Sequence, residues 1–267
     1  MSDLATQYWN DGIAMPLDLL SEGEAAEAAA KYYAFQERAK AKTGGPIYVK
    51  PHLVAPWVYD IGTHSKLLDA VEACIGPNIL IWCSDVFNKV AGSGKYIGFH
   101  QDSKYWGLSP SDKMVSAWIA LTPSKPETGN MQVVKGTHRA GILDHKETYH
   151  PDNMLSVGQE VEFPYTSADI TDVTLNPGQF SLHHLDLIHG GKPNESDTDR
   201  IGLVFRFAAV GIRQERPNDA ATLVRGTDDG HFRLEPAPKE ELGEQELAEL
   251  NRVFKESPSG FGGMLIG

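Results

Sequence analysis

The sequence has few cysteines and no long apolar run. Cys74 and Cys83 are the only cysteines in 267 residues, which is too few for a disulfide framework, and their spacing matches neither a zinc ribbon nor a Cys-x-x-Cys redox site. No stretch approaches about 18 uninterrupted apolar residues, so we expect no membrane span. The first residues, MSDLATQYWNDG, lack the basic start and apolar run of a signal peptide. These absences predict a cytoplasmic protein with buried thiols.

Positive charge is also scarce. The chain has 24 Lys and Arg against 36 Asp and Glu, which gives a net charge of −12. Nucleic acids and anionic membranes attract basic surfaces, so we expect neither as a partner. The acidity itself is explained by solubility and indicates no particular function. With 41% hydrophobic residues, the chain is long enough to form a packed core.

Three segments have the composition of helices. Residues 21–44 begin with Ser21 and Glu24 at the spacing of a capping box, continue with helix formers and end at a Gly-Gly pair. Residues 64–75 form a second candidate, with Thr63 as a possible N-cap, and residues 239–256 a third.

Short apolar runs rich in β-branched and aromatic residues dominate from residue 78 onward. Many of the 26 glycines and 16 prolines separate these runs. Strands without alternating helices predict an antiparallel sandwich or barrel rather than a parallel sheet. We therefore expect one domain over residues 1–267, with N-terminal helices to about 77, an all-β core from about 78 to 235, and a helical tail from about 236 to 267.

Three His-x-Asp pairs could each offer two ligands to one metal ion. The pair at 150–152 has proline in the middle of a polar stretch, which is typical of a surface turn. The pair at 184–186 lies in QFSLHHLDLIHGG, where both side chains share a face if 179–190 is one strand. His100 and Asp102 also share a face if their strand continues, with side chains about 6.5 to 7 Å apart.

A third ligand can come from His189, which ends the predicted strand just before two glycines. His100, Asp102 and His189 would then form the two-histidine, one-carboxylate set of non-haem iron(II) oxygenases. A zinc hydrolase would more often use a further histidine or a cysteine, so zinc is the weaker alternative.

Arg200 lies 11 residues after His189, at the start of RIGLVFRF. The intervening GGKPNESDTD is rich in turn formers, so we expect it to return the chain as a neighbouring antiparallel strand and to place Arg200 beside the strand of His189. If the cosubstrate is 2-oxoglutarate, the planar guanidinium can bind its far carboxylate with two hydrogen bonds.

These motifs occur in a characteristic order, and the chain resembles the phytanoyl-CoA dioxygenase (PhyH) family of Fe(II)/2-oxoglutarate-dependent oxygenases from about residue 65 to residue 210. The order is His-x-Asp, a tryptophan in the next strand, G.M.V..GTH, a histidine, and an arginine 11 residues later. Four segments carry the resemblance: LDAVEACIGPNILIWCSDVFNK, FHQDSKYWG, SAWIALTPSKPETGNMQVVKGTHR and HHLDLIHGGKPNESDTDRIGLVFRF.

The resemblance implies a double-stranded β-helix, which is a jelly-roll or cupin-like barrel, with Fe(II), 2-oxoglutarate and O2 as its requirements. It implies that His100, Asp102 and His189 bind iron, that Arg200 anchors the cosubstrate and that Trp118 lines the cosubstrate pocket. Lys50 and Asp85 are the nearest matches to two further cosubstrate contacts. Trp106 matches an aromatic wall of the substrate pocket in relatives that hydroxylate ectoine.

The expected reaction is hydroxylation of an unactivated C–H bond, with release of succinate and CO2. Halogenating relatives replace the aspartate by a small residue, whereas this chain keeps Asp102. Gln101 and His184 are candidates for orienting the ligands. The candidate substrate residues mix aromatic, polar and cationic groups, which favours a small or medium polar metabolite: Asn88, Tyr96, Tyr105, Trp106 and Arg206.

Two other functions stay open from the sequence. The same iron chemistry can lead to desaturation, cyclisation or epimerisation in a biosynthetic pathway. A cupin-type metal-binding protein or isomerase would share the architecture without using 2-oxoglutarate. Arg200 discriminates between the classes, because a cupin of that kind has no need for a carboxylate anchor.

Overall fold

Two β-sheets pack against each other in the computed structural model, which describes residues 3–215 and 219–256. The larger sheet is antiparallel except for its last pair of strands, and its order is β1 (Ile13–Asp18), β10 (Gln179–His183), β5 (Met114–Ala120), β12 (Arg200–Ala209), β2 (Ile79–Lys89), β14 (Ala220–Arg225) and β15 (Arg233–Leu234). The second, antiparallel sheet has the order β3 (Ile97–His100), β11 (His189–Gly191), β6 (Met131–Val134) and β9 (Ile170–Val173).

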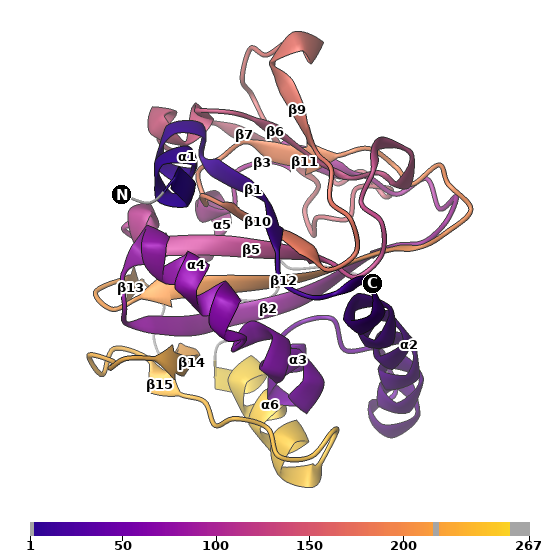
Figure 1. The fold of residues 1–267 in the computed structure, drawn as a ribbon, viewed down its shortest axis with the longest axis vertical. Helices are drawn as coiled ribbons and strands as arrows, with labels where there is room; N and C mark the ends of the chain where they lie inside the picture. Colours follow the sequence, from indigo (N-terminus) through magenta and orange to yellow (C-terminus); the bar gives the residue numbers. More distant parts are fainter. Residues whose placement is uncertain (1–2, 216–218, 257–267) are drawn as a thin grey trace.

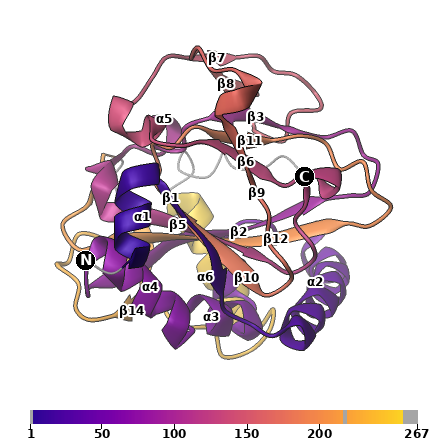
Figure 2. The ribbon, with the colours of Figure 1, turned by 45° about the horizontal axis from the view of Figure 1, so that its top comes forward.

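Two small two-stranded sheets complete the strands of the described residues. They pair β13 (Arg213–Gln214) with β4 (Leu108–Ser109), and β7 (His145–Glu147) with β8 (Gln159–Val161). The β7–β8 pair contacts β3 and lies on the outer side of the second sheet (Figure 2).

Helices cover the larger sheet on the side away from the second sheet (Figure 1). The α-helices are α1 (Asp3–Asp11), α2 (Glu22–Thr43), α3 (Pro56–Gly62), α4 (Ser65–Ile75), α5 (Ser103–Trp106) and α6 (Glu244–Glu256). Gly62 at the end of α3 lets the helix approach the sheet closely, because a Cβ there would lie 2.5 Å from Cε1 of Phe205. The larger apolar core fills this helix–sheet layer.

The central strand β12 shows why the site forms between the sheets. Its alternate residues Leu203, Phe205 and Phe207 belong to the helix-side core. On the other face of the strand, Arg200, Val204 and Arg206 line a pocket. A strand with one apolar face and one face that carries two arginines therefore separates the helix-side core from the site.

The three predicted helices are present, as α2, α4 and α6. Ser21 and Glu24 form the predicted capping box, whereas the N-cap of α4 is His64 rather than Thr63. Strand β1 was not anticipated in the predicted helical segment before residue 77. The predicted helical tail extends to residue 267, and its part from 257 onward lies outside the described residues.

The single strand predicted over 179–190 is wrong. The chain leaves the larger sheet after His183, turns through 184–188 and enters the second sheet as β11. The backbone N–H of Leu187 donates to the carbonyl oxygen of His184 (3.0 Å), and Nδ1 of His184 accepts from the N–H of Asp186 (3.0 Å). This turn links the two sheets, so the faces expected from strand alternation do not apply beyond residue 183.

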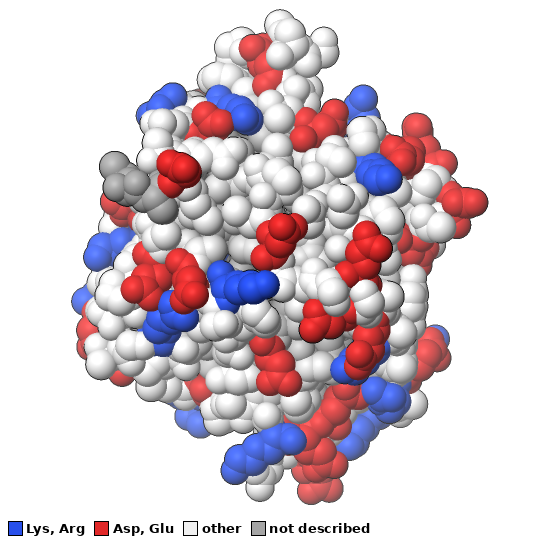
Figure 3. Space-filling view, in the orientation of Figure 1, with Lys and Arg blue, Asp and Glu red and all other residues white. Residues whose placement is uncertain are grey.

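Acidic side chains are spread over the face seen in Figure 3, with basic side chains among them, so the net charge of −12 is not gathered into one patch there. Within the described ranges, no helix has the length and apolar character needed to cross a membrane.

Candidate active site

Two neighbouring strands of the second sheet bring the candidate metal ligands together. His100 ends β3 and His189 begins β11, and the two residues are direct cross-strand partners. Their rings lie 4.3 Å apart between centroids. Asp102 follows the strand as the N-cap of α5 with helical backbone angles. The expectation that β3 continues through Asp102 is therefore wrong, and the turn into α5 directs the carboxylate back toward the histidines.

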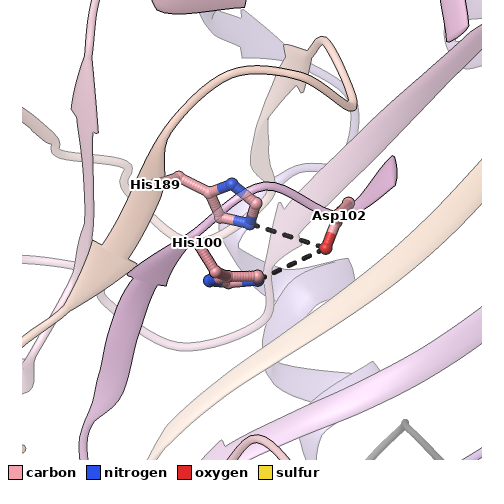
Figure 4. A group of neighbouring side chains, drawn as sticks. All are labelled: His100, Asp102 and His189. Carbon is pink, nitrogen blue, oxygen red and sulfur yellow. Dashed lines mark ion pairs between the residues drawn. The ribbon is translucent and has the colours of Figure 1, made fainter. Parts of the chain in front are cut away.

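The three side chains converge on one point (Figure 4). Oδ1 of Asp102 lies 3.3 Å from Nε2 of His100 and 3.9 Å from Nε2 of His189. Ligand atoms of all three residues lie within 4.8 Å of one another. Nδ1 of His100 donates to the carbonyl oxygen of Gly98 (2.9 Å), and Nδ1 of His189 to that of Leu187 (3.0 Å). Both Nε2 lone pairs are thus available for a metal ion.

His189 and Asp102 have the protonation states that a metal requires. Burial, together with the neighbouring His100, lowers the pKa of His189 to about 4. Burial alone raises the pKa of Asp102, but His189 and His100 beside it bring that pKa below its usual value. Near neutral pH His189 is neutral and Asp102 ionised, so two imidazole nitrogens and one carboxylate fit a divalent iron ion.

A pocket between the two sheets opens onto the three ligands. Residues from both sheets, from α5 and from the β7–β8 region line it: Phe87, Lys89, Ile97, His100, Asp102, Tyr105, Trp106, Trp118, Met131, Leu155, Gln159, His183, His189, Gly190, Arg200, Val204 and Arg206.

Arg200 lies in this pocket without an acidic partner. Its side chain is buried, and Nη1 donates to the carbonyl oxygen of Gly129 (3.0 Å). Nε and Nη2 have no hydrogen-bond partner within the described residues. Burial lowers the pKa of Arg200 to about 10, so the guanidinium stays charged near neutral pH. A buried guanidinium with free donors suits a ligand carboxylate.

The position of Arg200 differs from the expected one. Its strand β12 pairs with β2 and β5 in the larger sheet, and not with β11 of His189. Arg200 and His189 thus line the same pocket from opposite sheets.

The indole ring of Trp118 lies against the guanidinium of Arg200. The guanidinium carbon lies 5.1 Å from the centroid of the Trp118 ring. Gly202, two residues after Arg200, makes room for this ring, because a Cβ there would lie 2.1 Å from Cζ2 of Trp118. The glycine and the tryptophan together place the arginine.

A family model described as phytanoyl-CoA dioxygenase (PhyH) matches residues 7–202, which is most of the chain. The chain belongs to the PhyH family. This family is part of the Fe(II)/2-oxoglutarate-dependent oxygenase superfamily, which uses iron and 2-oxoglutarate.

Curated relatives agree with the family. The chain is 27% identical to human peroxisomal phytanoyl-CoA dioxygenase over 151 residues, covering 55% of this chain and 45% of the relative. It is 25% identical over 163 residues to a probable alpha-ketoglutarate-dependent hypophosphite dioxygenase of Stutzerimonas stutzeri, covering 60% and 56%. The chain thus spans about half the length of the curated relatives it matches.

Solved structures match over almost the whole chain. The non-heme monooxygenase ThoJ in its apo form has a TM-score of 0.88 and 30% identity, with 97% of each chain covered. CytC3 with Fe(II) and alpha-ketoglutarate has a TM-score of 0.66 and 17% identity, covering 91% of this chain and 98% of CytC3, and shows a shared fold only. The arrangement of helices and antiparallel sheets therefore matches PhyH-family oxygenase structures.

Some residues expected at this PhyH-family site line the pocket and others do not. Tyr105, Trp106 and Arg206 line it. Arg206 pairs with the buried carboxylate of Asp85, and its guanidinium carbon lies 4.6 Å from the Trp106 ring centroid. Asp85 therefore reaches the pocket only through Arg206.

The other expected residues lie outside the pocket lining. Lys50 is buried in an ion pair with Glu235 and also donates to the carbonyl oxygen of Ala220 (3.0 Å). Asn88 lies on the face of β2 opposite to that of the pocket residues Phe87 and Lys89. The hydroxyl of Tyr96 donates a hydrogen bond to Glu160 on β8 (3.3 Å). The structure does not bring Lys50, Asn88 or Tyr96 to the metal ligands.

Two buried pocket residues were missed from the sequence. His183 lines the pocket with its ring 5.0 Å from that of His189, and burial lowers its pKa to about 3. The sequence pointed instead to its neighbour His184. Lys89 lines the pocket directly opposite Arg200 across the β2–β12 pair. Lys89 could have been found from the sequence by expecting the end of β2 to pair with the start of β12.

Proposed function

We propose that this protein is an Fe(II)- and 2-oxoglutarate-dependent dioxygenase that hydroxylates an unactivated C–H bond of a small or medium polar metabolite, with release of succinate and CO2. One observation carries the proposal: a buried His-Asp-His set shares a pocket with a buried arginine that has no acidic partner. A cupin-type protein that does not use 2-oxoglutarate has no need for such an arginine.

Each residue of the set has a distinct role in this proposal. His100, Asp102 and His189 hold the iron, which, when bound, supplies the activation of O2 coupled to decarboxylation of 2-oxoglutarate. Arg200 binds the far carboxylate of the cosubstrate and Trp118 holds the guanidinium in place. The retained Asp102 carboxylate occupies the position that chloride would need, which favours hydroxylation over halogenation.

The substrate side of the pocket has aromatic walls and one cationic group. Tyr105 and Trp106 come from the α5 turn that follows Asp102, so they lie next to the metal ligands. Arg206 is held against Trp106 and is neutralised by Asp85. A polar substrate that stacks on an aromatic ring and accepts a hydrogen bond suits this wall better than a bare hydrocarbon.

The proposal includes the architecture expected from the sequence. The two packed sheets form a double-stranded β-helix, with residues 1–267 as a single domain. The cytoplasmic location stays a prediction.

The test is the visible charge-transfer band of the Fe(II)–2-oxoglutarate chelate, measured without oxygen. We expect the wild-type protein to give the band and Asp102→Ala to lose both the band and succinate formation. Asp152→Ala, in the exposed His-x-Asp pair, is the matched control and should behave as wild type. A folded wild-type protein without the band would overturn the proposal. A panel of polar metabolites, followed by succinate release above the uncoupled background, then identifies the substrate.

A further inference from the structure

Two arginines of β12 line the same pocket at positions far apart along the strand. Arg200 and Arg206 are separated by six residues, so their Cα atoms lie roughly 20 Å from each other. Val204 lies between them in the pocket lining. A 2-oxoglutarate molecule whose far carboxylate lies at Arg200 is much shorter than this distance. Arg206 therefore belongs to a separate part of the pocket, which is free for the primary substrate.

Arg206 is one member of a line of polar residues on three neighbouring strands, β10, β5 and β12 (Figure 1). His183 on β10 pairs with Ser116 on β5, and Ser116 pairs in turn with Arg206 on β12. Cross-strand partners lie on the same face of a sheet, and His183 and Arg206 both line the pocket on this face. We call His183, Ser116 and Arg206 the polar row.

The polar row carries buried hydrogen-bonding atoms that have no partner. Its three residues are at most 4% exposed. Within residues 3–215 and 219–256, Nδ1 of His183, Oγ of Ser116 and Nε of Arg206 make no hydrogen bond. Buried polar groups in folded proteins are normally hydrogen-bonded, and leaving one unpaired is destabilising. Three such atoms on adjacent strands of one pocket wall indicate a polar ligand.

Two contacts hold the Arg206 side chain in place. Its guanidinium pairs with the carboxylate of Asp85 and lies over the ring of Trp106. Trp106 packs in turn against Trp82, with 5.3 Å between the ring centroids. Arg206 therefore presents its donors from a fixed position beside an aromatic wall.

The charges around the polar row are balanced. Burial lowers the pKa of Arg206 to about 10, so the guanidinium stays charged, and Asp85 neutralises it. Burial lowers the pKa of His183 to about 3, so its imidazole is neutral near pH 7. A substrate carboxylate would bring an unbalanced negative charge into this buried region, and it only accepts hydrogen bonds. An amide is uncharged and both accepts and donates, which matches a guanidinium beside a hydroxyl and an imidazole.

We propose that the polar row recognises the primary substrate and binds an uncharged amide group of it. The amide oxygen accepts from Arg206, and the amide N–H donates to Ser116 or His183. The inference rests on the proposed function, since it names the substrate class of the same pocket. The His183 ring lies 5.0 Å from that of the metal ligand His189, so the C–H bond that reacts lies within a few bonds of the amide.

Small aromatic probes test the inference before the natural substrate is known. The protein is loaded with Zn(II), which does not activate O2, and is saturated with 2-oxoglutarate to occupy the Arg200 end of the pocket. Three matched pairs are titrated by NMR: benzamide and benzoate, phenylacetamide and phenylacetate, and 3-phenylpropanamide and 3-phenylpropanoate. We expect the amides to bind more tightly than their matched acids, by about tenfold for the best pair. Equal or tighter binding of the acids, or binding of neither series, would overturn the inference.

Asp85→Asn separates recognition by charge from a purely structural role. Asparagine has nearly the same shape as aspartate but leaves Arg206 without its counter-charge, so a carboxylate becomes the better partner. We expect the preferred member of the best pair to change from the amide to the acid. An unchanged preference for the amide in a folded Asp85→Asn protein would contradict the inference.

Two further variants test the other contacts of the amide. Arg206→Met and His183→Phe should each raise the Kd of the best amide by about tenfold and leave the 2-oxoglutarate Kd unchanged, because the cosubstrate binds at the other end of the pocket. Arg38→Met, which breaks an exposed ion pair with Glu241, is the matched control and should change neither constant. If a variant fails to fold, the comparison of amides with acids on the wild type still decides.

The inference and the proposed function fail in different ways. A folded wild-type protein without the Fe(II)–2-oxoglutarate charge-transfer band overturns the proposed function, whatever the probes show. A normal band together with a preference for the acids leaves the proposed function standing and overturns only the amide site.

Discussion

Each metal-facing histidine is oriented by the backbone carbonyl two residues before it. Nδ1 of His100 contacts Gly98 O and Nδ1 of His189 contacts Leu187 O. Because a carbonyl oxygen can only accept, Nδ1 must carry the proton and Nε2 keeps its lone pair. The tautomer required for metal binding is therefore set by local backbone and needs no carboxylate partner.

His145 shows that this local contact does not by itself create a metal ligand. Its Nδ1 also faces the carbonyl oxygen two residues earlier, that of Leu143, at 2.9 Å. Its Nε2, however, accepts from the backbone N–H of Gln101 at 3.0 Å. The same tautomer thus holds the β7 segment against the loop between the two ligands His100 and Asp102.

Gly202 offers a test of how Arg200 is supported. In Gly202→Ala the new Cβ would lie 2.1 Å from Trp118, so the indole must move away from the guanidinium. We expect the 2-oxoglutarate Kd to rise by about tenfold, as measured from the anaerobic charge-transfer band. We also expect a loss of about 1 to 3 kcal/mol in the free energy of unfolding.

The matched control is Gly45→Ala, where a Cβ meets no atom within 4 Å and the backbone is not left-handed. It should change neither quantity. Unaltered binding in a folded Gly202→Ala protein would show that the position of the Trp118 ring does not matter for Arg200.

The sequence identified the site residues that carry a distinctive motif and missed those that depend on register. His100, Asp102, His189 and Arg200 stand at spacings that few other functions use. Lys89 is an ordinary lysine at a strand end, and only the pairing of β2 with β12 places it opposite Arg200. Lys50, Asn88 and Tyr96 have suitable chemistry, but their strands or turns direct them elsewhere.

At the scale of elements, the helices were predictable and the strands only in part. Caps such as Ser21 with Glu24 fix helix ends locally, so residues 22–43 could be assigned from sequence. Strand alternation continues without a visible break through residues 179–190, although the chain changes sheet there. The turn there contains a hydrogen bond from the backbone N–H of Asp186 to the His184 ring, which periodicity does not reveal.

The turn at residues 184–188 also holds the loop that carries Asp102. The carboxylate of Asp186 accepts hydrogen bonds from Ser103 and from Ser111, the latter at 2.6 Å. Its carbonyl oxygen accepts from Nε2 of Gln101 at 2.7 Å. Asp186 is thus bonded to the residues on both sides of Asp102, which fixes that loop relative to His189.

We expect Asp186→Ala to weaken metal binding while the protein stays folded. The loop that carries Asp102 loses its anchor, so the three ligands are less well placed, and the Kd for Fe(II) or Mn(II) should rise by about tenfold. Calorimetric metal titration without 2-oxoglutarate measures this directly. Asp152→Ala, in an exposed His-x-Asp pair, is the control and should match wild type. Unchanged metal affinity in Asp186→Ala would mean that the turn has no positioning role.

At the scale of the whole molecule, the pocket and the core between the sheets share their walls. Trp118, Met131 and Val204 belong to the smaller apolar core and also line the pocket. The site is therefore placed by sheet packing, with the two metal-binding histidines on one sheet and Lys89 and Arg200 on the other. Packing of distant strands of this kind cannot be read from local sequence patterns, which explains why Arg200 was expected beside the wrong strand.

A second buried ionic cluster ties residues near the N-terminal helices to the C-terminal part of the chain. Lys50 pairs with Glu235, and the Glu235 carboxylate also accepts from Thr222 (2.9 Å). His52 lies 3.7 Å from the same carboxylate and contacts Ser84 through Nδ1 (2.6 Å). None of these residues is in the pocket lining, so we expect the cluster to have a structural role.

The cluster predicts how stability depends on pH. Burial alone raises the pKa of Glu235, but Lys50 and His52 bring it to about 2, whereas an unfolded glutamate titrates at about 4.3. A depressed folded pKa means that the stabilisation is complete above the unfolded pKa and is lost as pH falls toward 2.

Glu235→Gln leaves Lys50 buried without its counterion. Urea denaturation at neutral pH should therefore show a loss of about 3 to 5 kcal/mol in the free energy of unfolding, and this difference should shrink as the pH falls below 4. Glu27→Gln, which breaks the exposed pair with Lys31, should cost less than about 1 kcal/mol. If Lys50 instead served the cosubstrate, Glu235→Gln would alter the 2-oxoglutarate Kd; we expect that constant to stay at the wild-type value.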